Sequence, residues 1–316
     1  MHGWIILDKP LGLGSTQGVS AVKRALRDGG YGKLKVGHGG TLDPLATGVL
    51  PIAIGEATKL AGRMLDSDKV YDFTIAFGMQ TDTLDLEGKV VATSDVRPTQ
   101  AAVAAVLLRF TGPIEQVPPA YSALKVAGER AYDLARAGEE VVLAGRKVTI
   151  HILEIAKPLP FRSWAAVPSP GRDCGPTPEG EELSEIALTA HVSKGTYIRS
   201  LARDIALALG TVGHVTMLRR TKAGPFDLRH AISLDKLSEL GHARALEDKL
   251  LPLRAGLDDI PALSLSPDQA GLLRQGRVLI GIAVNDGPYF AMLEDIPVAL
   301  VEAETGEIRV VRGFNL

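Results

Sequence analysis

The sequence predicts a globular fold of mixed helices and strands that ends in a small β-rich segment. A chain of 316 residues is long enough for one large domain and one small domain. Hydrophobic residues make up 46% of the chain and charged residues 23%, which are ordinary proportions for a protein with a sizeable core. Segments of helical and of strand-like hydrophobic spacing occur together up to about residue 250, and short strand-like segments follow.

In the first half of the chain, apolar runs predict strands and a 3.6-residue spacing predicts helices. Val19, Val22 and Leu26 share one face of the first helix, and Asp28 with the two glycines after it breaks that pattern. The expected elements are a strand at 3–7, a helix at 16–26, strands at 49–54 and 70–77, and an alanine-rich helix at 101–110.

In the second half, Pro118 and Pro119 stop any helix and open a loop. Leu201, Ile205 and Leu209 lie on one stripe of a later helix. The expected elements are a helix at 127–137, strands at 148–155 and 186–192, a helix at 197–209, and short tail strands at 277–282, 298–301 and 308–311.

Two segments interrupt this pattern. Residues 161–182 hold four prolines, three glycines and several charges, and predict a mobile surface insertion, because such a composition buries too little apolar area to offset backbone ordering. Residues 251–261 separate the helical stretch from the tail strands. We therefore expect a large domain at residues 1–250 and a small one at residues 259–316.

The composition argues against several classes of protein. No apolar run approaches the roughly 20 residues of a membrane span, and the N-terminus lacks the pattern of a secretory signal, so we expect a cytoplasmic protein. The single cysteine, Cys174, excludes an internal disulfide and a cysteine-based zinc cluster, and the seven histidines show no paired ligand spacing. We therefore expect no metal.

The net charge of −2 is low for a protein that binds nucleic acid, because such binding rests largely on phosphate neutralisation by Lys and Arg. Part of the acidity lies in residues 254–316, which hold nine Asp and Glu against five Arg. The basic clusters are Lys23, Arg24, Arg27, Lys33 and Lys35; Lys125, Arg130 and Arg136; and Arg219, Arg220 and Lys222. These clusters support RNA binding, although a charge cluster is more often a solvated helix face.

One carboxylate, Asp43, stands in a glycine-rich segment directly before Pro44, with His38 five positions upstream. Pro44 restricts Asp43 to extended backbone angles and therefore argues against a helical position. The neighbouring glycines permit positive φ angles or a close approach of a ligand to the backbone. Such a segment is typical of a functional loop. Asp-Pro is also a common turn dipeptide, and the residues alone leave both interpretations open.

The run from Lys35 to Leu60, KVGHGGTLDPLATGVLPIAIGEATKL, closely resembles the signature GHxGTLDPxAxGxLxxxxGxATK of the bacterial tRNA pseudouridine synthase B family. Members of that family isomerise uridine 55 in the T-loop of tRNA, and their catalytic aspartate maps onto Asp43. The resemblance implies an α+β fold, in which a catalytic domain with a mixed, largely antiparallel sheet precedes a small β-rich RNA-binding domain. That domain is of the pseudouridine-synthase-and-archaeosine-transglycosylase (PUA-like) type.

Other segments resemble the same family. DSDKVYDFTIAFGMQTDTLDLEG places the family's active-site tyrosine at Tyr71, SKGTYIRSLARDIALALG places its arginine at Arg199, and HVTMLRRTKAGPF contains Leu218. IILDKPLG and QVPPAYSALKVAGERAYDLAR resemble two further motifs. One departure is the segment KPLGLGSTQGVS, which runs one residue longer than the family pattern.

The reaction explains these residue types. Uridine must lose its N-glycosidic bond, rotate and reattach through C5, and a carboxylate can act as the nucleophile at the sugar or at the base. The resemblance implies that Asp43 is this nucleophile. Arg199 would oppose the rise in the Asp43 pKa that desolvation causes. Tyr71 would serve as the base at C5 or stack on the uracil.

The remaining site residues are expected to bind RNA. The resemblance implies that His38 and Tyr197 contact RNA and that Leu218 lines the base pocket. Taken without the resemblance, Tyr71 and Leu218 would be assigned to the core, and Arg199 is equally compatible with a surface ion pair.

The expected partner is the T-arm of tRNA, whose target base must be flipped out of a folded loop. We expect a monomer that needs no cofactor, membrane or protein partner. A non-catalytic RNA-binding or tRNA-folding protein remains an alternative that would not require Asp43. A guide-RNA-dependent pseudouridine synthase is a second alternative, against which the absence of long basic extensions argues.

Overall fold

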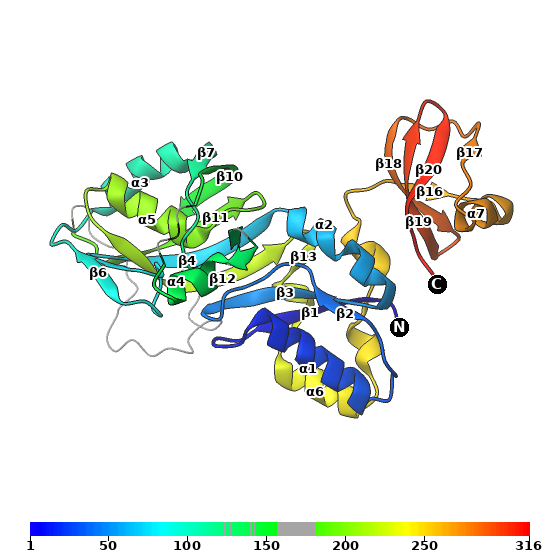
Figure 1. Cartoon of the computed structure of the whole chain (residues 1–316), viewed down its shortest axis with the longest axis horizontal. Helices are drawn as coiled ribbons and strands as arrows, with labels where there is room; N and C mark the ends of the chain where they lie inside the picture. Colours follow the sequence, from blue (N-terminus) through cyan, green and yellow to red (C-terminus); the bar gives the residue numbers. More distant parts are fainter. Residues whose placement is uncertain (123, 127, 140, 142, 157–180) are drawn as a thin grey trace. The chain divides into compact units, whose positions relative to one another are not determined.

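The computed structural model describes residues 1–122, 124–126, 128–139, 141, 143–156 and 181–316 (Figure 1). These residues form two compact units, which we call unit 1 (residues 1–65 and 222–316) and unit 2 (residues 66–221). The insertion expected at 161–182 lies, except for its last two residues, outside the described residues.

Unit 1 is built on two antiparallel strands, β1 and β3, which pair from Gly3 opposite Ile54 to Lys9 opposite Gly48. Both strands are almost entirely buried, because alternate side chains face opposite layers. Trp4 belongs to a hydrophobic core on one face. Its elements before the tail are β1 (Gly3–Lys9), α1 (Ser15–Asp28), β2 (Val36–His38), β3 (Ala46–Ile54), η1 (Gly55–Leu60), α2 (Ala61–Asp66), β13 (Phe226–Asp227), η3 (Leu228–His230), β14 (Ala231–Ile232), α6 (Leu234–His242), η4 (Leu246–Lys249), β15 (Leu251–Pro252) and η5 (Leu253–Gly256).

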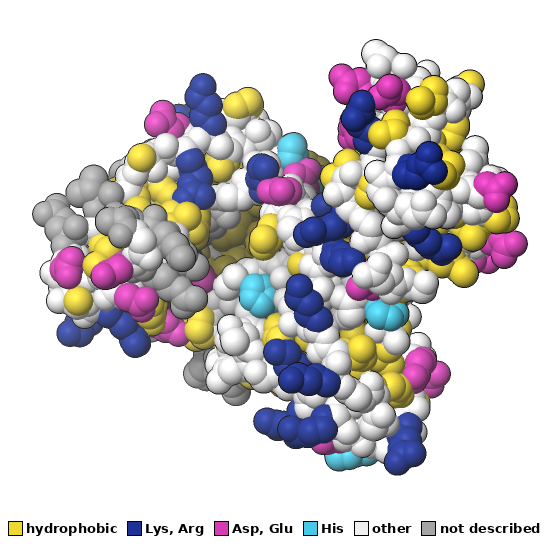
Figure 2. Space-filling model, turned by 45° about the vertical axis from the view of Figure 1, so that its right-hand side comes forward, with side chains coloured by type: hydrophobic (Ala, Val, Ile, Leu, Met, Phe, Trp, Pro, Cys, Tyr) yellow, Lys and Arg dark blue, Asp and Glu magenta, His cyan; other side chains and the backbone are white. Residues whose placement is uncertain are grey.

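Helix α1 covers the other face of β1 and β3. Its Gly18 leaves no spare room against the sheet, since a Cβ there would lie 3.0 Å from Leu50 and 3.5 Å from Leu7. A Cβ at Gly241 of α6 would lie 2.9 Å from the carbonyl oxygen of Ala25 in α1, so α6 packs closely beside α1 (Figure 1). The outer side of this helix pair carries Lys and Arg side chains (Figure 2).

The C-terminal tail of unit 1 forms a separate five-stranded sheet in the order β16-β18-β19-β20-β17. This sheet and helix α7 enclose a core of their own. Phe290 and Phe314 of the tail belong instead to the core that contains Trp4. The tail elements are β16 (Ala262–Ser264), α7 (Pro267–Arg274), β17 (Leu279–Ile280), β18 (Gly287–Leu293), β19 (Ile296–Glu304) and β20 (Glu307–Gly313).

Unit 2 is a sheet in the order β12-β4-β11-β10-β7, packed against α3 and α5 (Figure 1). Alternate residues of β4, such as Phe73 and Ile75, enter the same core as Ile198 and Leu201 of α5. Its elements are β4 (Lys69–Phe77), β5 (Met79–Thr81), β6 (Val90–Thr93), α3 (Gln100–Leu107), η2 (Leu108–Phe110), β7 (Gly112–Gln116), β8 (Lys125–Val126), β9 (Glu129–Arg130), α4 (Ala131–Arg136), β10 (Arg146–Ile155), β11 (Glu185–Val192), α5 (Ile198–Ala208) and β12 (Gly213–Ala223).

The predicted α+β fold is confirmed. Strands β1 and β14 are parallel, whereas β1–β3, β4–β11, β11–β10 and β10–β7 are antiparallel, and the tail is rich in β-strands. The expected helix at 127–137 is shorter, because residues 125–126 and 129–130 pair as a small hairpin before α4. Compactness groups the tail with the N-terminal residues, and the division into domains at 1–250 and 259–316 stays a prediction.

The basic cluster of Arg219, Arg220 and Lys222 is less exposed than an RNA-binding surface would require. Arg220 lies on β12 and is only 1% exposed, so its guanidinium is part of the interior rather than of an RNA-binding surface. Lys222 remains exposed at the end of the same strand.

Candidate active site

Asp43 lies in the loop between β2 and β3 of unit 1, outside any helix, as Pro44 predicts. Its side chain is half-buried, and its carbonyl oxygen accepts a hydrogen bond from the Ala46 N–H at 3.0 Å. The Pro44 carbonyl accepts a hydrogen bond from the Gly12 N–H at 2.9 Å. Gly12 has a φ of 78° and lies in the loop between β1 and α1. That loop therefore holds the backbone beside Asp43.

Ser15 ties the start of α1 to the residue before Asp43. Its Oγ donates to the Leu42 carbonyl at 3.0 Å and accepts from the Leu42 N–H at 2.8 Å. Both residues are buried, so this pair of bonds replaces solvent for both backbone groups of Leu42. The backbone on the N-terminal side of Asp43 is thereby fixed to the helix.

Lys9 supports the same loop from the end of β1. Its ammonium is completely buried and donates to the carbonyls of Pro10, Leu13 and Pro44 at 3.1, 2.6 and 3.1 Å. A buried charge requires such partners, because desolvation is otherwise costly. No role for Lys9 was predicted from the sequence. The available signal was its position at the end of the apolar run GWIILDK, in which Asp8 is the only other charged residue.

Two glycines shape the approach to Asp43. A Cβ at Gly39 would lie 2.6 Å from the Met64 Cβ, which real contacts do not allow. Gly40 has a φ of 133°, a conformation that side chains disfavour. His38 precedes them on β2, opposite Ile52 of β3, and is half-buried. The glycine-rich segment is therefore required by close packing and backbone conformation.

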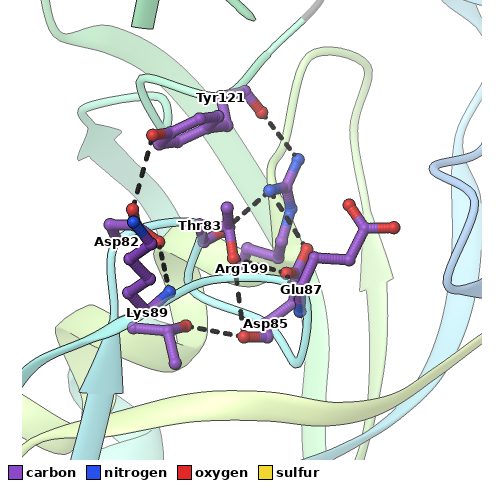
Figure 3. Close-up of polar contacts among 8 residues, drawn as sticks. Asp82, Thr83, Asp85, Glu87, Lys89, Tyr121 and Arg199 are labelled. Carbon is purple, nitrogen blue, oxygen red and sulfur yellow. Dashed lines mark hydrogen bonds and ion pairs between the residues drawn. The ribbon is translucent and has the colours of Figure 1, made fainter. Parts of the chain in front are cut away.

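Arg199, in the first turn of α5, is the centre of a buried polar cluster in unit 2 (Figure 3). It is 6% exposed, and its Nη1 donates to the Thr83 carbonyl at 2.8 Å while its Nη2 donates to the Tyr121 carbonyl at 2.9 Å. The same Nη1 lies 3.2 Å from Oδ2 of Asp85, whose side chain is 9% exposed. Three oxygens around one planar guanidinium fix its orientation.

Asp85 is itself held by its own loop. Its Oδ1 accepts hydrogen bonds from Thr83 Oγ1 at 2.5 Å and from the Glu87 N–H at 3.0 Å (Figure 3). Leu84 between them has a φ of 62°, which is unusual for a branched side chain. Asp85 lies in the segment TDTLDLEG, which resembles the family, but no role for Asp85 was predicted from the sequence. An aspartate among apolar and hydroxyl residues was the available signal.

The other predicted residues of unit 2 lie along its core. Tyr71 on β4 and Leu218 on β12 are half-buried and pack against the same hydrophobic cluster. Tyr197 precedes α5, and its N–H donates to Oε1 of Gln116 at 2.8 Å. The Arg146 guanidinium lies 5.4 Å from the centre of the Tyr197 ring, a cation–π contact.

Lys69, at the start of β4, is a buried cation with a perturbed pKa. Burial, and then the nearby positive charge of Arg220, lower the pKa of Lys69 to about 8. Asp68 and Asp66 oppose this shift. The sequence offered no signal for it, because a lysine at a strand end is ordinarily exposed.

The predicted site residues are divided between the two units. Asp43 and His38 belong to unit 1, and Tyr71, Tyr197, Arg199 and Leu218 belong to unit 2. Within unit 2 the carboxylate paired with Arg199 is Asp85. The expected role of Arg199 toward Asp43 therefore stays a prediction.

The segments that carry these residues match known families. Residues 27–198 match the family model described as TruB family pseudouridylate synthase (N terminal domain), and residues 199–258 match the tRNA pseudouridylate synthase B C-terminal domain. The first match alone covers more than half of the chain. The chain belongs to the TruB family of pseudouridylate synthases.

Curated relatives match over the whole length. The chain is 66% identical over 316 residues to tRNA pseudouridine synthase B of Novosphingobium aromaticivorans, covering 100% of this chain and 98% of the relative. It is 58% identical over 315 residues to tRNA pseudouridine synthase B of Zymomonas mobilis subsp. mobilis, covering 100% and 96%. As a member of this family, the chain is an isomerase that forms pseudouridine in tRNA.

Solved structures of pseudouridine synthase complexes share this fold. A chain from the structure of a Cbf5-Nop10-Gar1 complex has a TM-score of 0.69 and 25% identity, covering 99% of this chain and 84% of that one. A chain from the structure of an H/ACA RNP bound to a substrate RNA containing 2′-deoxyuridine has a TM-score of 0.68 and 23% identity, covering 99% and 85%.

The described residues show neither a membrane-spanning helix nor a metal-binding group. None of their helices combines the length and the apolar composition that crossing a membrane requires. Among the same residues, no group of three or more His, Cys, Asp and Glu side chains is arranged to hold a metal ion.

Proposed function

We propose that this enzyme converts uridine 55 in the T-loop of tRNA to pseudouridine, with Asp43 as the nucleophile. The observation that carries the proposal is the Asp43 loop. It bears the family signature, and Ser15, Lys9 and the close-packed Gly39 hold its backbone in place. A positioned carboxylate is what a nucleophilic mechanism requires, because a reacting atom must be held within reach of its target.

The reaction leaves the atoms of the nucleoside unchanged in number. The bond from C1′ to N1 breaks, a bond from C1′ to C5 forms, C5 loses a proton and N1 gains one. Asp43 adds either to the sugar or to the base in this sequence, and both routes fit a single carboxylate. Tyr71 serves as the base at C5 or stacks on the uracil.

Arg199 is the proposed cationic partner of the reaction. A guanidinium with a fixed orientation can stabilise the negative charge of the nucleophilic carboxylate. The ion pair with Asp85 and the two carbonyl contacts keep the guanidinium in one orientation. His38 and Tyr197 are proposed to contact RNA, and Leu218 to line the base pocket.

The proposed partner is the T-arm of tRNA, bound by a monomer in the cytoplasm without a guide RNA or a protein partner. Residues 1–250 supply the chemistry, and residues 259–316 form a PUA-like domain that adds affinity for tRNA. The solved relatives from RNP complexes are 22–25% identical to this chain, whereas relatives named tRNA pseudouridine synthase B reach 66%. This difference favours the guide-independent activity.

The test is modification of a bare tRNA transcript by the purified chain. Nucleoside mass spectrometry with site mapping should find pseudouridine at position 55 and at no other uridine. Modification only after addition of a guide RNA or partner proteins would refute the guide-independent activity. Tyr71→Phe with lost turnover would assign proton transfer to its hydroxyl, and unchanged turnover in Tyr71→Phe and Tyr71→Leu would remove Tyr71 from the site.

A further inference from the structure

The exposed face of α1 is a continuous polar surface. On a helix of 3.6 residues per turn, its outward side chains fall within an arc of about 120° and extend over about 17 Å. The opposite face, with Val19, Val22 and Leu26, is buried against the sheet. We call the outward set the α1 strip: Thr16, Gln17, Ser20, Lys23, Arg24 and Arg27, all exposed.

The strip is cationic and largely unpaired. Within the part of the chain that the structure describes, Lys23 and Arg24 take part in no ion pair. Arg27 lies 3.5 Å from its neighbour Asp28, yet its side chain is 74% exposed. Asp28 is the only acidic residue between positions 15 and 42, where five Lys and Arg occur, although the whole chain carries a net charge of −2. Positive charge is therefore concentrated here.

The strip begins beside the candidate nucleophile. Thr16 follows Ser15, whose Oγ is bonded to both backbone groups of Leu42, and Leu42 precedes Asp43. These contacts lie within unit 1. The cationic half of the strip thus extends away from the Asp43 loop along the exposed face of α1.

A second basic segment leads to the same loop. Lys33 and Lys35 are exposed on the chain that enters β2, and the Lys35 carbonyl accepts a hydrogen bond from the Gly55 N–H at 2.8 Å. His38 lies three residues further along this strand. Several separate groups of Lys and Arg side chains appear in the lower half of Figure 2.

From this placement we infer that the α1 strip binds the phosphate backbone of the T-arm next to the flipped nucleotide. The inference rests on the proposed function, because that function places the target uridine at Asp43. The strip is about 17 Å long, which is enough to contact several successive phosphates of one strand. Hydroxyl, amide, Lys and Arg side chains are the groups that contact phosphates in nucleic-acid complexes. Such contacts position the RNA without reading its sequence.

The test measures binding of a T-arm hairpin RNA between about 50 and 200 mM salt, where each lost phosphate contact lowers the slope of log K against log salt by roughly 0.7 to 0.9. The variant carries Lys23→Gln, Arg24→Gln and Arg27→Gln, because glutamine has a helix propensity close to that of Lys and Arg. We expect its slope to be smaller by about 2 and its affinity at the lower salt to fall at least tenfold.

A matched control removes the same charge elsewhere. Arg109, Lys147 and Lys249 are exposed and lie outside the strip, and their combined change to Gln should leave the slope unchanged. Lys23→Arg with Arg24→Lys and Arg27→Lys should also keep the slope, since phosphate contacts depend on charge. An equal slope for the strip variant and the control would overturn the inference.

Two other outcomes are decisive. A loss seen with full-length tRNA but absent with the T-arm hairpin would overturn the placement beside the flipped base. Binding is measured without turnover, so a failure of the wild-type chain to form pseudouridine at position 55 would refute the proposed function separately. If the strip variant shows the expected smaller slope while the wild-type chain does not modify position 55, the strip is still supported as a phosphate-binding surface.

Discussion

Arg199 and Asp85 form an ion pair with 3.2 Å between Nη1 and Oδ2, and both side chains are more than nine-tenths buried. Removing one charge from such a pair leaves the other uncompensated, at a cost on the order of 3 kcal/mol. Asp85→Asn should therefore lower the free energy of unfolding by about that amount and reduce the single-turnover rate at saturating tRNA. Urea unfolding and rapid-quench kinetics measure the two effects.

Asp82→Asn is the matched control in the same loop. Oδ1 of Asp82 accepts a hydrogen bond from the Lys89 N–H at 2.9 Å, and Oδ2 accepts one from the Tyr121 hydroxyl at 3.4 Å (Figure 3). In asparagine the carbonyl oxygen can keep the Lys89 bond, and the amide nitrogen can donate to the Tyr121 hydroxyl. We expect this change to cost less than about 1 kcal/mol. Equal losses in Asp82→Asn and Asp85→Asn would show that the ion pair has no special role.

Ser15→Ala should loosen the backbone beside Asp43. The substitution removes both hydrogen bonds to Leu42 and leaves buried backbone groups unsatisfied, which costs about 1–3 kcal/mol. We expect kcat to fall while KM for tRNA changes little, because a positioned nucleophile acts in the transition state. Ser238→Ala on the exposed face of α6 is the control and should leave both constants unchanged. A Ser15→Ala enzyme with wild-type kcat would show that catalysis does not depend on these hydrogen bonds.

Lys69 should make stability depend on pH above neutrality. Its pKa of about 8 lies below the ordinary 10.5, so between these values the folded state binds fewer protons than the unfolded state and stability rises with pH. The cost of the buried charge, up to about 3 kcal/mol, is present below pH 8 and is relieved as the pH rises toward 10.5. Lys69→Met should remove this rise in stability, which chemical denaturation measures across the same pH range. Parallel profiles for the two proteins would refute the shift.

Phe314→Ala should destabilise the rest of unit 1 as well as the tail. Phe314 is 3% exposed and packs in the core that contains Trp4 and Val49. Its replacement by alanine leaves a cavity that lowers the free energy of unfolding by about 3–5 kcal/mol. Asn315 N–H also donates to Glu56 of η1 at 2.8 Å, which fixes the chain end to the signature segment. Thermal unfolding should show a lower transition for the signature segment as well. A transition confined to residues 259–316 would contradict the shared core.

The periodic elements of the fold were predictable from local sequence. Strands β1, β4 and β11 and helices α1 and α5 begin and end within about two residues of their expected bounds, because burial sets the spacing of their apolar residues. Strand β12 was not predicted. Arg219, Arg220 and Lys222 suggested a surface cluster, and the burial of Arg220 depends on its neighbours in the sheet rather than on its own spacing.

The candidate site was predictable where a motif carried it. Asp43 and Arg199 followed from the signature segments, whereas Ser15, Lys9 and Asp85 did not. The roles of these three depend on partners that lie far away in the sequence, such as Leu42, 27 residues from Ser15. Spacing within a motif contains no information about such partners.

The most direct test of the central claim is pseudouridine formation by Asp43→Asn in a bare tRNA transcript, followed by mass spectrometry at position 55. An amide has nearly the shape of the carboxylate but is a poor nucleophile, so the variant should fold, bind tRNA with wild-type affinity and form no pseudouridine. Asp43→Ala should behave in the same way. Appreciable turnover by Asp43→Asn, with deamidation excluded by mass spectrometry of the protein, would contradict the assignment of Asp43 as the nucleophile.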